Sequence, residues 1–185
     1  MVNLSLPKNS RTYGEGRTGF FKSLFRVLLL ATFAVWFGGF FFYAAFVVPL
    51  GTEVLGSARA QGFITRLVTH RINGLCFATL VLMAIELIGC WHWSPRWSRM
   101  AQLGSIALIG ALLISLVLIH PQLDKMLDVP RKQVHDRADF YQLHRVYLWA
   151  STIQWGLAWV WLVAVLTNWS GEIRFRHSSK ASQSD

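Results

Sequence analysis

Four long apolar runs constrain what this chain can fold into. They extend from Val27 to Leu50, from Ile72 to Trp91, from Ala101 to Ile119 and from Val146 to Thr167. Each is close to the roughly 20 residues that a helix needs to cross the hydrocarbon core of a bilayer. A hydrophobic content of 54%, with 9 Trp in 185 residues, is also high for a water-soluble domain. The sequence therefore predicts a multi-pass integral membrane protein.

These runs are predicted to be helices rather than strands. Polar and apolar residues do not alternate along them, as they would in the strands of a membrane barrel. A helix also satisfies its own backbone hydrogen bonds within lipid. We therefore predict an all-α fold, in which residues 26–168 form a four-helix transmembrane bundle with short connectors. Mobile basic segments are expected at residues 1–25 and 169–185.

Basic residues indicate how the bundle is oriented. The flank before the first run is strongly basic, through Lys8, Arg11, Arg17, Lys22 and Arg26. Because the first helix usually dominates topology, both termini are predicted to lie in the cytoplasm, with the protein in a plasma or inner membrane. The formal charge of +9 has no basic-aromatic motif beside it, so we expect lipid rather than nucleic acid as the partner. A membrane-protein partner or a second copy of the chain is also compatible with the sequence.

One predicted helix carries a continuous polar stripe. His144, Tyr147, Ser151 and Gln154 are spaced three, four and three residues apart and therefore share one helix face. Near the start of the second run, His70 and Asn73 repeat the pattern. Lipid penalises such groups, so these six residues are predicted to form a polar bundle interior. They either fix helix packing by hydrogen bonds or line a functional pocket.

Histidines are concentrated near one membrane face. His70, His120, His135 and His144 all flank the first and third connectors. Imidazoles on facing helices can ligate haem or a transition metal, and His70, His120 and His144 are the candidate ligands. Against this, they lack the spacing of one ligating helix face, and no thiolate accompanies them. We therefore expect no cofactor, with haem or a metal as the alternative.

Three further features lead to structural expectations. Glu86 is an intramembrane carboxylate with no basic partner inside the runs, so it is expected to snorkel to the interface rather than handle protons. Pro121, directly after His120, is expected to end the third helix. A small-residue face on that helix suits close helix approach, and its members are Gly104, Ala107, Ala111 and Ser115.

Three short segments resemble a known family. They are Val35-Trp36-Phe37-Gly38-Gly39 leading to Val47-Val48-Pro49, then His120-Pro121-Gln122-Leu123, and then Phe140-Tyr141-Gln142-Leu143-His144-Arg145. With these segments the chain resembles the uncharacterised four-helix "transmembrane protein 205"-like membrane family and its bacterial counterparts, over about residues 30–167. The resemblance implies four membrane helices in this order. Some relatives are linked with resistance to metal-containing drugs or resemble copper-resistance domains, which adds weight to the histidines without assigning ligands.

The sequence offers no catalytic residues. It contains no nucleophile-base pair at a helix start, no metalloprotease spacing and no phosphate-cradling loop. The function predicted is therefore a non-enzymatic structural or assembly role. The alternatives are a haem- or metal-binding module that uses His70 and His144, and a transporter of a small solute or ion.

Overall fold

The fold is an all-α bundle with four long helices, as predicted. The structure is a computed structural model, and it describes residues 11–92, 94–128, 133–134 and 137–181. The chain forms helix α1 (Arg11–Phe42), a π-helical turn η1 (Tyr43–Val47), α2 (Val48–Val54), α3 (Ala58–Cys90), α4 (Arg96–Met126) and α5 (Arg137–Ala181). Between α4 and α5, two short strands, β1 (Leu127–Asp128) and β2 (Gln133–Val134), pair antiparallel.

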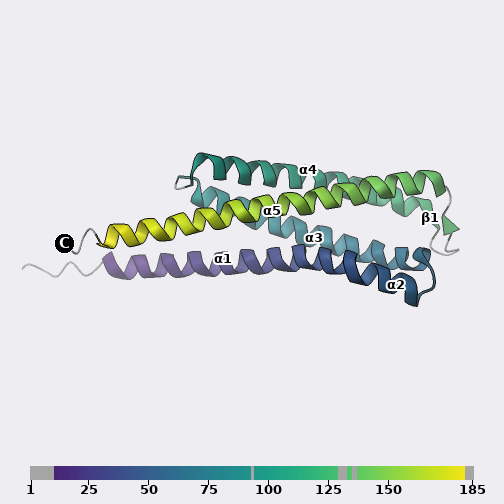
Figure 1. Cartoon of the computed structure of the whole chain (residues 1–185), viewed down its shortest axis with the longest axis horizontal. Coiled ribbons are helices and arrows are strands. Elements are labelled where there is room, and N and C mark those ends of the chain that lie inside the picture. Colours follow the sequence, from purple (N-terminus) through teal and green to yellow (C-terminus); the bar gives the residue numbers. More distant parts are fainter. Residues whose placement is uncertain (1–10, 93, 129–132, 135–136, 182–185) are drawn as a thin grey trace, which may run out of the picture.

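The long helices lie side by side and run antiparallel in chain order. Helix α1 begins at the same end of the bundle where α5 ends, and we call this the terminal end (Figure 1). The opposite end holds α2 and the β1–β2 pair, and we call it the loop end. The start of α1 and the end of α5 therefore lie at the same end of the bundle.

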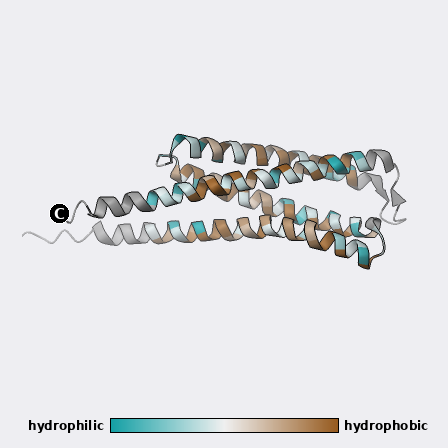
Figure 2. Ribbon diagram, in the orientation of Figure 1, coloured by the Kyte–Doolittle hydropathy of each residue, from teal (hydrophilic) through white to brown (hydrophobic). Residues whose placement is uncertain are grey.

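Within the described part of the chain, four segments are long and apolar enough to cross a membrane: Gly19–Val54, Ala60–Cys90, Arg96–Leu123 and Tyr141–Glu172. Hydrophobic residues cover the central part of these helices, and hydrophilic ones gather nearer the ends (Figure 2). Many large apolar side chains are exposed, for example Ile88 at 74% and Trp149 at 65%. In a membrane this exposed surface contacts lipid chains rather than water.

The helices extend past the predicted domain boundaries at residues 26 and 168. Helix α1 begins at Arg11, and α5 continues to Ala181. Trp169, just past the predicted boundary, lies inside α5 and is buried. The first and last long helices are therefore longer than the apolar runs inside them, because polar residues beyond each run continue the helix. The mobility expected for residues 1–10 and 182–185 lies outside the described residues.

The core is rich in aromatic rings between α1 and α5. Phe33 stacks on Trp161 with ring centroids 5.4 Å apart, and Phe37 stacks on Trp155 at 4.6 Å. In contrast, α4 packs most extensively against α5, through small residues such as Ala158, Ala164 and Ser98. Bulky rings therefore join α1 to α5, whereas close backbone approach joins α4 to α5.

The face of α4 that enters the core is not the predicted one. Ala107, Ala111 and Ser115 are exposed, and Gly104 is only half-buried. The buried face carries hydrogen-bonding and large apolar side chains instead: Ser98, Gln102, Ser105, Ile109, Leu113 and Leu116. Polar groups need partners that lipid does not offer, whereas alanine can face lipid at little cost. The prediction of close approach through the small-residue face is therefore wrong.

Helix α4 also continues through Pro121 to Met126, so the expectation that this proline ends the helix is wrong. A proline lacks the backbone N–H and clashes with the preceding turn, but membrane helices tolerate it where neighbouring groups compensate.

At the loop end, the turn into α3 uses Gly56 at a φ of 63°. A side chain at Gly51 would collide with the Gln61 amide, so glycine permits α2 to lie against α3.

Candidate functional site

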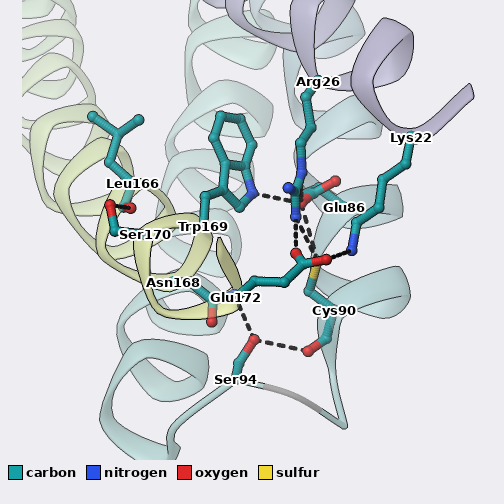
Figure 3. A network of polar contacts seen from close by, with 10 residues as sticks. All are labelled: Lys22, Arg26, Glu86, Cys90, Ser94, Leu166, Asn168, Trp169, Ser170 and Glu172. Carbon is teal, nitrogen blue, oxygen red and sulfur yellow. Dashed lines mark hydrogen bonds and ion pairs between the residues drawn. The ribbon is translucent and has the colours of Figure 1, made fainter. Parts of the chain in front are cut away.

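The terminal end contains a partly buried ionic cluster centred on Arg26 of α1. Its Nε donates to Glu86 Oε1 of α3 at 3.2 Å, and its Nη2 donates to Glu172 Oε2 of α5 at 2.7 Å. Lys22 Nζ adds a bond to Glu172 Oε1 at 2.6 Å. Figure 3 shows these side chains converging between α1, α3 and α5. With Cys90 and Trp169, these four residues form what we call the terminal network.

Glu86 is the most buried charged member of the terminal network, with its side chain only 4% exposed. Besides the Arg26 bond, Glu86 Oε1 accepts the indole N–H of Trp169 at 2.6 Å and the thiol of Cys90 at 3.0 Å (Figure 3). The Arg26 guanidinium also lies 4.7 Å from the centroid of the Trp169 ring. The expectation that Glu86 snorkels to the interface is therefore wrong, because it has an ion-pair partner inside the bundle.

Arg26 was missed as this partner because it lies one residue outside the first apolar run and was counted only as a topology signal. The similar depth of Arg26 and Glu86 in the membrane could have indicated their ion pair. Arg26 directly precedes the first helix run, and Glu86 lies just before the end of the second. Two antiparallel helices bring these positions to the same depth.

The cluster continues toward the connector between α3 and α4. Asn168 Nδ2 donates to Ser94 Oγ at 2.6 Å, and Ser94 Oγ donates to the Cys90 carbonyl at 2.8 Å (Figure 3). Deeper in the bundle, Ser98 Oγ of α4 donates to the Ala164 carbonyl of α5 at 3.0 Å. Polar contacts thus join α4 to α5 below the terminal network.

The predicted stripe on α5 lies in the bundle interior at three of its four positions. Tyr147, Ser151 and Gln154 are 7%, 6% and 5% exposed, which confirms those assignments. Gln154 Nε2 donates to the Ile109 carbonyl of α4 at 3.2 Å and to Cys76 Sγ of α3 at 3.3 Å. Ser151 bonds within its own helix, to the Tyr147 carbonyl at 2.9 Å. His144 is only half-buried.

At the loop end, side chains of α3 meet those of α4 and α5. Asn73 Nδ2 donates to the Tyr147 hydroxyl at 3.0 Å. His120 Nε2 lies 3.2 Å from the Arg66 carbonyl, and its ring centroid is 6.1 Å from that of His70. His120 of α4 therefore makes contacts with α3. His70 is exposed, so its predicted interior position is wrong.

The structure places two of the three candidate ligand histidines side by side, His70 and His120, rather than the pair His70 and His144 on which the haem hypothesis was based. Among the described residues, no group of three or more His, Cys, Asp or Glu side chains could hold a metal ion. His135 lies outside the described residues.

A groove of about 820 Å³ lies between α3 and α4 near the loop end. Its walls belong to these two helices only, and they include His70, Asn73 and His120 but not Gln154. It is therefore an outer groove, separate from the middle of the bundle.

Comparison with protein-family models, with curated proteins and with solved structures gives no match to this chain, so the resemblance to the four-helix family stays a prediction.

Proposed function

We propose that this chain is a non-enzymatic structural or assembly protein of the membrane. Its interior holds the helices in one arrangement, and its lipid-facing surface is the working surface. The observation that carries this proposal is a series of polar contacts between helices from one end of the bundle to the other. A membrane-protein partner or a second copy would dock on the outside.

Polar contacts between helices occur at several positions along the length of the bundle. Arg26 joins α1 to α3 and α5 at the terminal end, and Ser98 joins α4 to α5 further in. Gln154 joins α5 to α3 and α4 at the middle. Toward the loop end, Asn73 joins α3 to α5, and Tyr43 of η1 donates to Thr65 of α3 at 2.9 Å. Interhelical hydrogen bonds in membranes contribute about 0.6 kcal/mol each on average, so their sum favours one arrangement.

A transport function receives less support from these contacts. A pathway through the bundle requires polar groups that water or a solute can reach. Gln154, the deepest polar residue of the predicted stripe, uses its amide N–H groups for two protein contacts. Cys76 and Met83 of α3 and Trp161 of α5 are 0% exposed. The middle of the bundle is filled by these side chains.

The two cysteines provide a built-in probe of this interior. Cys76 contacts Gln154 at the middle, and both thiols are free and buried. In a Cys90→Ser variant, Cys76 is the one thiol, because the chain has 2 Cys. We expect a small charged methanethiosulfonate reagent to leave Cys76 unmodified in native membranes and to modify it after solubilisation in SDS, as read by mass spectrometry.

The matched control carries its thiol in the connector between α3 and α4. His92 is exposed there, outside the membrane spans, so His92→Cys in a chain without the native cysteines should react in native membranes. Rapid modification of Cys76 in native membranes, at a rate close to that of this control, would demonstrate a water-filled path and contradict the proposal in favour of transport. Stoichiometric haem or metal that is lost in His70→Ala and His120→Ala would contradict it in favour of the cofactor-binding alternative.

The proposal includes the orientation with both termini in the cytoplasm. The basic flank before the first span supports it. Reporter fusions at each end of the chain test it, and activity of an extracytoplasmic reporter at either end would overturn it.

A further inference from the structure

The outer groove between α3 and α4 has two chemically different parts. Its part nearest the loop end holds the cationic side chains Arg66 and Arg71 together with the imidazoles of His70 and His120. Toward the membrane middle its walls become apolar, through Gly74, Phe77, Leu113 and Val117. None of the described residues that line it carries a carboxylate.

The apolar part opens toward lipid. Phe77 and Val117 are 62% and 53% exposed, although they lie within the membrane spans. Gly74 leaves open space beside the backbone, because a Cβ built there meets nothing within 4 Å. An acyl chain can therefore lie along α3 at this point.

The length of the groove matches part of a lipid molecule. From Arg66 to Phe77 a helix rises roughly 16 Å, at 1.5 Å per residue. This distance reaches from the headgroup region well into one leaflet, given a hydrocarbon core about 30 Å thick. With the cationic part at headgroup depth, the apolar part would therefore lie at acyl-chain depth.

We infer that this groove is a binding site for a phospholipid with an anionic headgroup, with the phosphate held between Arg66 and Arg71 and one acyl chain lying over Gly74 and Phe77. Guanidinium groups bind phosphate oxygens in a bidentate manner. Basic pockets between membrane helices are a general mode of recognition for anionic lipids. The inference does not depend on the proposed structural role, because it uses the outer surface and not the interior contacts.

The test is native mass spectrometry of the purified full chain in detergent, titrated with phosphatidylglycerol or phosphatidylcholine of identical acyl chains. Each Arg near a surface contributes about 1 kcal/mol toward anionic lipid, so two give a preference of roughly thirtyfold. Arg66→Gln/Arg71→Gln should abolish most of that preference. Arg96→Gln/Arg99→Gln, which removes the same charge at the other end of the bundle, should retain it. Equal affinity of the intact chain for both lipids would overturn the inference.

A second variant tests the acyl-chain part without touching charge. Gly74→Leu fills the open groove, and leucine favours a helix more than glycine does, so the variant should fold. Its control is Gly89→Leu on the same helix, where a Cβ also meets nothing within 4 Å. Phosphatidylglycerol binding should fall at least tenfold in Gly74→Leu only. Displacement of the lipid by glycerol phosphate at equal concentration, with no effect of Gly74→Leu, would identify a soluble phosphate as the ligand and refute the lipid site.

Discussion

Arg26→Met is expected to lower the free energy of unfolding by roughly 3–5 kcal/mol, the range for breaking a buried ion pair from one side. Arg26 bonds both Glu86 and Glu172, and its side chain is only 16% exposed. Without it, Glu86 stays buried with no cation, since Lys22 bonds Glu172. The measurement is reversible unfolding in mixed SDS micelles, followed by tryptophan fluorescence.

The double variant Arg26→Met/Glu86→Met separates the ion pair from general damage. Replacing both charged partners by apolar groups is often far less costly than removing one, so this variant should regain much of the lost stability. Arg96→Met at the same end of the bundle provides the control, since Arg96 is exposed. Equal losses for Arg26→Met and Arg96→Met, with no recovery in the double variant, would show that the terminal network does not stabilise the bundle.

The four helices could be predicted because the length and composition of a membrane span depend only on local sequence. The run from Val146 to Thr167 is apolar enough to indicate a helix, and the period of Tyr147, Ser151 and Gln154 shows which face turns inward. A face that carries several polar groups at helical spacing has one favourable orientation in lipid. Such signals require no knowledge of the neighbouring helices.

The pairing of helices could not be predicted in the same way. Whether Glu86 snorkels or is buried depends on a cation that lies sixty positions away in the sequence. The face of α4 that enters the core depends on competition between Ser98 and Gln102, which need partners, and small residues such as Ala107, which do not. The burial of Glu86 and the buried face of α4 both depend on contacts between helices, and these contacts cannot be read from a single sequence.

The tryptophans of α5 show how the same residue type takes two roles in one helix. Trp161 is fully buried and stacks on Phe33 of α1, whereas Trp149 is 65% exposed to the surroundings of the bundle. Trp155 is half-buried and stacks on Phe37. Hydrophobicity alone does not distinguish these positions, since each ring suits both lipid and a protein core.

Trp161→Ala is therefore expected to cause the second large loss of stability, lowering the free energy of unfolding by about 3–5 kcal/mol. It removes the largest fully buried side chain among the described residues and leaves a cavity between α1 and α5. Trp149→Ala on the same helix should change stability by about 0.5 kcal/mol or less, since it removes only contacts with lipid or detergent. The stability of Trp161→Phe should lie between the stabilities of these two alanine variants and close to that of the wild type. It keeps an aromatic ring against Phe33 and removes an indole N–H that has no hydrogen-bond partner among the described residues.

The measurement is again unfolding in mixed SDS micelles, here followed by far-ultraviolet circular dichroism because the variants alter tryptophan fluorescence. A loss in Trp149→Ala as large as in Trp161→Ala would contradict the burial order along α5 and, with it, the packing of α1 against that helix.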